Sequence, residues 1–214
     1  MNTEALARRD RSILTLKKEG IPYLTDLPVI ETEAEAKRRS AEEVADRAIA
    51  LSLVAVKGEG LDQETLLKIL AKYGREDSFT AKEKSFIHNP FPTEHDRVQF
   101  TWRYECYWVL LWALGFIDQL SRPDGICDVP RATSILMDLG RAGFLKSANL
   151  LPMSEILDAA DLIYRYHWAV VDARVNGKEL PSGLDPGVVM ERHYALNWLI
   201  GAGDEDWDDI HTNT

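Results

Sequence analysis

The sequence has few cysteines and no long hydrophobic run. Its 214 residues include two cysteines, Cys106 and Cys127. Their spacing forms no CxxC pair and no histidine pattern accompanies them, so free thiols are favoured over a disulfide or a zinc site. No run approaches the ~18 uninterrupted apolar residues of a membrane span, and the N-terminus lacks the apolar core of a secretory signal. We therefore predict a soluble, cytoplasmic protein that has no membrane contact.

Positive charge is also scarce. The chain carries 25 Lys and Arg against 35 Asp and Glu, a net charge of -10, and beyond Tyr107 the ratio is 8 to 16. Nucleic-acid binding needs clustered Lys and Arg, whereas the short basic runs at residues 8–11 and 37–39 are typical of solvated helix faces. The composition argues against a nucleic-acid partner. It leaves an acidic surface that attracts a basic protein partner.

The familiar catalytic and metal motifs are absent as well. The sequence contains no phosphate-binding loop, no nucleophile elbow and no Glu-x-x-His repeat of a dimetal bundle. The tail Asp204–Asp209 repeats the first, third and fifth ligand spacing of a calcium loop. However, Asp209 stands where the turn glycine belongs, and no twelfth-position glutamate follows. We predict no metal and no cofactor.

Helical patterns fill most of the chain, and no segment combines period-two alternation with hairpin turns. Pro22 and Pro28 predict an extended connector near the N-terminus. The fold class is therefore all-α, a single-domain orthogonal or irregular bundle of about seven to eight helices over residues 1–214. An acidic tail, residues 204–214, packs on this bundle or extends from it. Periodicity, capping residues and stop signals predict helices at about residues 3–19, 32–57, 61–73, 80–88, 93–118, 131–139, 155–175 and 185–200.

Three of these helices carry ionisable residues where the pattern expects apolar ones: Glu105, Asp161, His167, Arg192 and His193. A buried carboxylate needs a partner, and we expect Glu105 to pair with Arg192 across two helices. One interpretation is a structural network that fixes helix register. The other is a pocket in which a carboxylate acts as base, a histidine as acid, base or ligand, and the arginine holds an anion.

Tyr107 and Trp108 lie off the main apolar stripe of their helix. Large aromatic side chains outside the core-facing stripe are typical of a second helix contact or of a partner surface. If they are exposed, this face favours a homodimer.

Four ordered segments resemble a bacterial family of uncharacterised proteins, the domain-of-unknown-function family 4272. They read SILTLKKEGIPYLTDLP, TWRYECYWVLLWALGFID, SEILDAADLIYRYHWAVVDAR and VVMERHYALNWLIGAGDEDWDDIHTNT. The resemblance implies a single domain of unassigned activity and supplies no catalytic residue. Two functions stay open: a non-catalytic binding or regulatory protein with an acidic surface, and an enzyme or small-molecule sensor with an inter-helix pocket. The first is favoured because no catalytic motif is recognisable.

Overall fold

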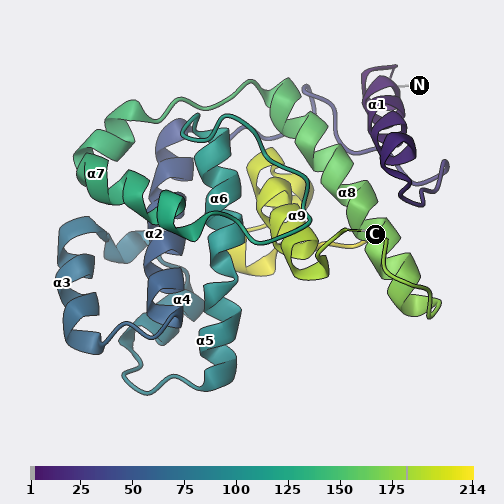
Figure 1. Ribbon diagram of the computed structural model, residues 1–214. Helices are drawn as coiled ribbons and strands as arrows, with labels where there is room; N and C mark the ends of the chain where they lie inside the picture. Colours follow the sequence, from purple (N-terminus) through teal and green to yellow (C-terminus); the bar gives the residue numbers. More distant parts are fainter. Residues whose placement is uncertain (1–2, 182) are drawn as a thin grey trace. The chain divides into compact units, whose positions relative to one another are not determined.

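The computed structural model describes residues 3–181 and 183–214 (Figure 1). In this part of the chain it contains nine α-helices and three short 3-10 helices, and no strand. The all-α prediction is confirmed. The α-helices are α1 (Thr3–Glu19), α2 (Ala41–Gly58), α3 (Gln63–Tyr73), α4 (Ala81–His88), α5 (Glu94–Thr101), α6 (Arg103–Ala113), α7 (Val129–Ser147), α8 (Met153–Val175) and α9 (Pro186–Ile200).

The chain forms two compact units. Unit 1 combines Met1–Arg39, Ser121–Ile126 and Leu151–Thr214, and so contains α1, α8 and α9. Unit 2 combines Ser40–Leu120 and Cys127–Leu150 and contains α2 to α7. The prediction of a single domain stays a prediction.

In unit 1, α8 packs against both α1 and α9. Leu16, Leu157 and Leu196 contribute apolar side chains that are buried. Asp185 caps α9 by accepting hydrogen bonds from the N–H groups of Gly187 and Val188, and proline occupies the first turn. The helix ends at Gly201, which adopts a left-handed conformation that glycine accommodates without steric strain. These local signals set the start and the end of α9, the helix that carries part of the candidate site.

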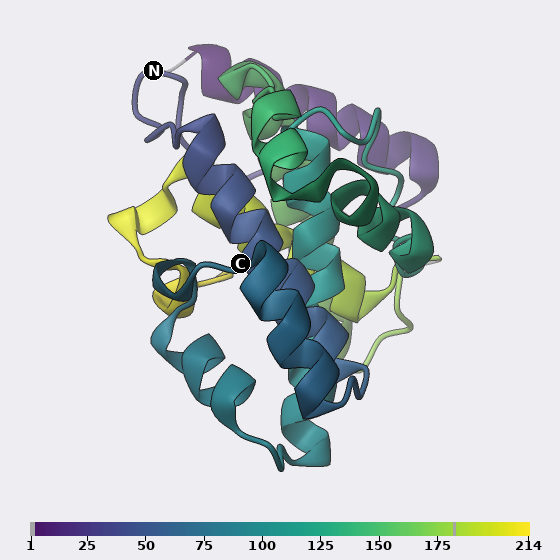
Figure 2. The same cartoon turned by 90° about the vertical axis from the view of Figure 1, so that its left-hand side faces the viewer.

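In unit 2, α2 is the helix around which the others gather. It contacts α3, α4, α5, α6 and α7, and most of its side chains are buried. Figure 2 shows α3 lying across the front of α2. Because α2 is apolar on almost every side, it cannot be a surface helix of the usual amphipathic kind.

The start of α2 corrects a prediction. The Thr32 amide and hydroxyl do bond to the Glu35 carboxylate, but no helix follows them. Instead, the backbone N–H of Lys37 donates to the Ile200 carbonyl, which leads the chain away from a helical path. The helix begins at Ala41, where Ser40 and Glu43 form the capping box. The same signal at Thr80 and Glu83 does start α4, as predicted.

The predicted helix over residues 93–118 is wrong in its continuity and in its end. It divides at Trp102 into α5 and α6, and α6 ends at Ala113. The Thr101 hydroxyl donates to the Arg97 carbonyl one turn earlier, a side-chain bond that bends helices. Beyond α6, Gly115 has a φ of 78° and turns the chain.

Candidate functional site

All five ionisable residues predicted on helix stripes are buried. Glu105 lies in unit 2, and Asp161, His167, Arg192 and His193 lie in unit 1. Within its unit, Glu105 accepts a hydrogen bond from the backbone N–H of Cys127. Arg192 donates from Nη1 to the Ser121 carbonyl at 2.7 Å. The expected pairing of Glu105 with Arg192 would be between residues of different units, and it stays a prediction.

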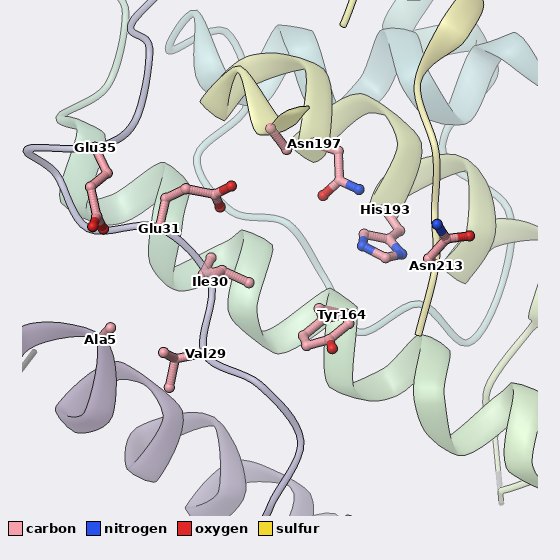
Figure 3. Close-up of a pocket in the computed structure, with 10 residues that line it drawn as sticks. Ala5, Val29, Ile30, Glu31, Glu35, Tyr164, His193, Asn197 and Asn213 are labelled. Atoms are coloured by element: carbon pink, nitrogen blue, oxygen red, sulfur yellow. The ribbon is translucent and has the colours of Figure 1, made fainter. Parts of the chain in front are cut away.

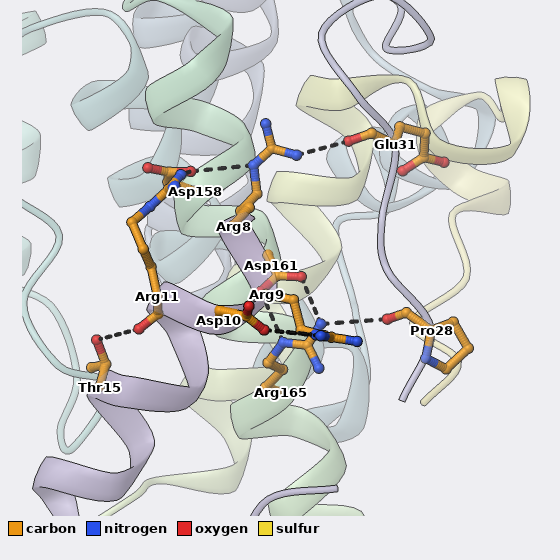
Figure 4. A network of polar contacts seen from close by, with 10 residues as sticks. All are labelled: Arg8, Arg9, Asp10, Arg11, Thr15, Pro28, Glu31, Asp158, Asp161 and Arg165. Carbon is orange, nitrogen blue, oxygen red and sulfur yellow. Dashed lines mark hydrogen bonds and ion pairs between the residues drawn. The ribbon is translucent and has the colours of Figure 1, made fainter. Parts of the chain in front are cut away.

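Asp161 has a partner that the sequence reading missed. Arg165 binds it through two hydrogen bonds, Nε to Oδ2 at 2.8 Å and Nη2 to Oδ1 at 2.9 Å (Figure 4). The two side chains are 0% and 1% exposed. The signal was present in the sequence, because residues four apart lie on the same side of a helix. Asp161 is therefore held by a guanidinium rather than presented as a base.

Arg8 corrects the view that the first basic run is a solvated face. Its side chain is buried, and Figure 4 shows it between α8 and the segment that follows α1. Nε donates to Asp158 at 3.2 Å, Nη1 to the Glu31 carbonyl at 3.0 Å, and Nη2 to Glu4 at 2.5 Å. These three acceptors compensate the burial of the charge. Arg8 thereby fixes the backbone at Glu31, which forms part of a cavity wall.

His167 of α8 and His193 of α9 make direct contact. Their Nδ1 atoms are 2.8 Å apart, and the ring centroids are separated by 5.1 Å in an edge-to-face arrangement. Burial lowers the pKa of His167 to about 4, with a contribution from the charge of Arg174. Burial likewise lowers the pKa of His193 to about 3, with a contribution from His167. Both rings are therefore neutral at pH 7.

The short distance determines how the two neutral rings are protonated. A hydrogen bond between two Nδ1 atoms requires a proton on one of them and a lone pair on the other. The ring that donates from Nδ1 has a bare Nε2, and its partner carries its proton on Nε2. The two Nε2 atoms of the pair therefore always differ: one is a hydrogen-bond donor and the other is an acceptor.

His193 lines a cavity of about 500 Å³, which we call the His193 cavity. Tyr164 stands beside His193 in it, with ring centroids 5.8 Å apart (Figure 3). Burial raises the pKa of Tyr164, so its hydroxyl stays protonated. The cavity is lined by Ala5, Val29, Ile30, Glu31, Glu35, Tyr164, His193, Asn197, Ala202 and Asn213.

The histidine pair predicts a pH-dependent stability. Both folded-state pKa values lie below the ordinary value of 6.5, so between about pH 6.5 and 4 the unfolded chain binds more protons than the folded one. Stability is therefore greatest above pH 6.5 and is lost as the pH falls. We expect the free energy of unfolding to drop by about 1–3 kcal/mol between pH 7.5 and 5.5. Urea denaturation at the two pH values measures this difference.

Two histidine variants test its source. His167→Gln removes one buried imidazole and should reduce the pH-dependent loss by roughly half. His95→Gln removes an exposed imidazole of α5 and should keep the full loss. The same pH dependence in both variants would show that the buried pair is not responsible.

Of the two interpretations of Tyr107 and Trp108, a second helix contact agrees with the structure better than an exposed partner surface. Both side chains are buried, and the Tyr107 hydroxyl donates to the Ala132 carbonyl of α7 within unit 2. The helix α6 is enclosed on more than one side, so residues off its main stripe are buried as well. The homodimer stays a prediction.

Two further observations concern membranes and metals. Among residues 3–181 and 183–214, no helix has both the length and the hydrophobicity of a membrane span. The same residues contain no group of three or more His, Cys, Asp or Glu side chains placed to hold a metal ion.

Comparison with known proteins gives a family and no closer relative. Searches of the curated proteins and of the solved structures found no match to the chain. One family profile matches residues 8–210, which include both histidines and every lining residue of the His193 cavity except Ala5 and Asn213. The chain belongs to this family, which is described as a domain of unknown function (DUF4272).

Proposed function

We propose that this protein binds a small, polar, positively charged molecule in the His193 cavity, without catalysing a reaction. The charge of the cavity wall carries this proposal. Glu31 and Glu35 contribute carboxylates, and neither Lys nor Arg occurs among the described lining residues. Hydrogen bonds from the amide and hydroxyl of Thr32 lower the pKa of Glu35, which keeps it ionised. An ammonium or guanidinium group complements such a wall, whereas an anion is repelled.

The cavity also offers neutral hydrogen-bonding groups. Among the described residues, neither the Tyr164 hydroxyl nor Nε2 of His193 has a hydrogen-bond partner, and neither atom is fully buried, so a ligand can reach both. Asn197 donates from Nδ2 to the His211 carbonyl at 2.8 Å, which fixes the orientation of its amide. Figure 3 shows the Glu31 side chain extending from the segment after α1 toward Asn197 and His193 of α9. A volume of about 500 Å³ is within the range of small-molecule sites.

Binding is favoured over catalysis by the state of the ionisable groups. With a pKa of about 3, His193 is a weak proton acceptor at neutral pH. Asp161, the other candidate base of unit 1, is held by two hydrogen bonds from Arg165. The groups that remain available are suited to recognising a ligand rather than to transferring a proton.

Agmatine is a suitable probe because it carries both an ammonium and a guanidinium group. We expect isothermal titration calorimetry to detect agmatine binding to the wild-type protein and no binding of succinate. Glu31→Gln keeps the shape of the side chain and removes its charge, so it should weaken agmatine binding about tenfold. Glu33→Gln removes a nearby exposed carboxylate that does not line the cavity, and should leave the affinity unchanged.

Two results would contradict the proposal. Succinate binding as tightly as agmatine would show that the carboxylates do not select the ligand. Equal losses in the Glu31 and Glu33 variants would show a general electrostatic attraction to the acidic chain instead of a site at the cavity.

A further inference from the structure

A second cavity adjoins the other histidine of the pair. Its volume is about 600 Å³, and we call it the His167 cavity. All of its lining residues belong to unit 1 and come from α8, from α9 and from the segment between them. They are His167, Val170, Val171, Ala173, Arg174, Gly177, Lys178, Leu180, Pro186, Gly187 and Met190.

The lining of the His167 cavity is apolar with a cationic edge. Val170, Leu180 and Met190 provide hydrophobic surface, and Leu180 and Met190 are themselves partly exposed. The charged lining residues are Arg174 and Lys178, and no carboxylate lines the cavity among the described residues. This composition is opposite in sign to that of the His193 cavity.

The two cations differ in their availability. Lys178 donates from Nζ to Asp172 at 2.7 Å, so its charge is partly neutralised. The Arg174 side chain is exposed and makes no hydrogen bond or ion pair with any described residue. Its charge nevertheless reaches His167 and contributes to the lowered pKa of that ring. Arg174 is therefore a guanidinium beside the cavity that is free to bind an anion.

His167 supplies a second polar contact from deeper in the wall. Its side chain is 7% exposed and lines the cavity, and its Nδ1 is engaged by His193. No described residue pairs with its Nε2. Nε2 is nevertheless not one of the fully buried side-chain atoms, so solvent reaches it and a ligand atom in the cavity can pair with it.

We propose that the His167 cavity is a second binding site, for a molecule with an apolar body and a single carboxylate. The apolar body packs against Val170, Leu180 and Met190, and the carboxylate pairs with Arg174. One carboxylate oxygen accepts a hydrogen bond from Nε2–H of His167. In this tautomer Nδ1 of His167 accepts the proton of His193, which leaves Nε2 of His193 as an acceptor.

The same tautomer serves both cavities. With Nε2 of His193 as an acceptor, the His193 cavity can bind the ammonium donor that we assign to it. Each ligand therefore favours the protonation pattern that the other needs, so the two should bind cooperatively. Only this coupling rests on the proposed function; the second site itself does not.

Decanoate below its micellar concentration is the probe for the second site, and decylammonium is the control with the opposite charge. We expect titration calorimetry to show saturable binding of one decanoate per chain and much weaker binding of decylammonium. Arg174→Gln should weaken decanoate binding about tenfold or more. Arg131→Gln removes an exposed arginine of α7 and should have no effect.

A second pair of variants tests the apolar wall. Met190→Glu places a carboxylate at the cavity on a side chain that is partly exposed, so folding is preserved while decanoate is repelled. Met137→Glu makes the same change at an exposed position of α7 and should leave binding intact. Equal affinity for decanoate and decylammonium, or equal losses in the two variants of either pair, would overturn the proposed site.

The coupling has its own measurement. Saturating decanoate should tighten agmatine binding severalfold, and agmatine should tighten decanoate binding by the same factor. If both bind but neither affects the other, the shared tautomer is refuted while both sites stand. If agmatine fails to bind and decanoate binds as described, the proposed function fails and the second site stands.

Discussion

Asp161→Asn is expected to lower the free energy of unfolding by about 3–5 kcal/mol, the largest effect that we predict for a single substitution. The carboxylate is 0% exposed and accepts both hydrogen bonds from a guanidinium that is 1% exposed. Asparagine keeps the size of the side chain but leaves the charge of Arg165 buried without its counter-ion. The remaining protein acceptor, the Pro28 carbonyl at 3.4 Å from Nη2, does not neutralise that charge.

Urea denaturation of three variants separates two effects on the free energy of unfolding: the cost of leaving one charge without a partner, and the contribution of the ion pair as a whole. Asp161→Leu combined with Arg165→Met removes both charges together, and should be far more stable than Asp161→Asn. Asp204→Asn breaks an exposed ion pair with Lys37 and should leave the midpoint unchanged. A double variant as unstable as the single one would show that the pair itself, rather than the orphaned charge, determines stability.

Lys57→Met should also be strongly destabilising, by about 2–4 kcal/mol. The ammonium group of Lys57 is buried in unit 2 and donates at 2.7 Å to each of the carbonyls of Phe86, Ile87 and Asn89. The last carbonyls of a helix have no partner within the helix, and here a lysine supplies it for the end of α4. Methionine fills the same space without a donor, so all three oxygens lose the hydrogen bond from the ammonium group. The Phe86 and Ile87 carbonyls keep only longer bonds from the Asn89 N–H and from Nε2 of Gln63.

Lys72→Met is the matched control, measured in the same way by urea denaturation. Lys72 lies 4.7 Å from the centre of the Tyr73 ring, much as Lys57 lies 5.1 Å from that of Phe86. Lys72 is exposed, however, and its substitution should cost little. If the two variants are equally stable, the carbonyl contacts of Lys57 contribute little to the fold.

The helices that carry strong local end signals could be predicted from the sequence. Asp185 and Pro186 start α9, Thr80 and Glu83 start α4, and Gly20 follows α1, each through contacts with near neighbours in the chain. Other bounds were wrong: the start of α2, the division and end of the helix predicted over residues 93–118, and the end of α7, which continues past Gly140 to Ser147. The start of α2 depends on a contact that is distant in the sequence. Lys37 is drawn to the Ile200 carbonyl, a contact between residues far apart in the sequence, and periodicity contains no trace of it.

Only part of the candidate site could be predicted from the sequence, for the same reason. Periodicity indicated that His167 and His193 occupy apolar stripes, but their direct contact depends on how α8 and α9 are registered. The i,i+4 spacing of Asp161 and Arg165 was readable in the sequence. The carboxylate and amide side chains of the His193 cavity come from an irregular segment, from α9 and from the chain end, and no sequence pattern places them together.

The contact between His167 and His193 makes two chemically identical side chains unequal. Each ring has two nitrogens and one proton, and the 2.8 Å contact forbids both from adopting the same tautomer. A contact that fixes the position of the proton on one ring therefore also fixes its position on the other ring. The interface between two packed helices therefore has two alternative arrangements of its protons. A change from one to the other needs no movement of the backbone.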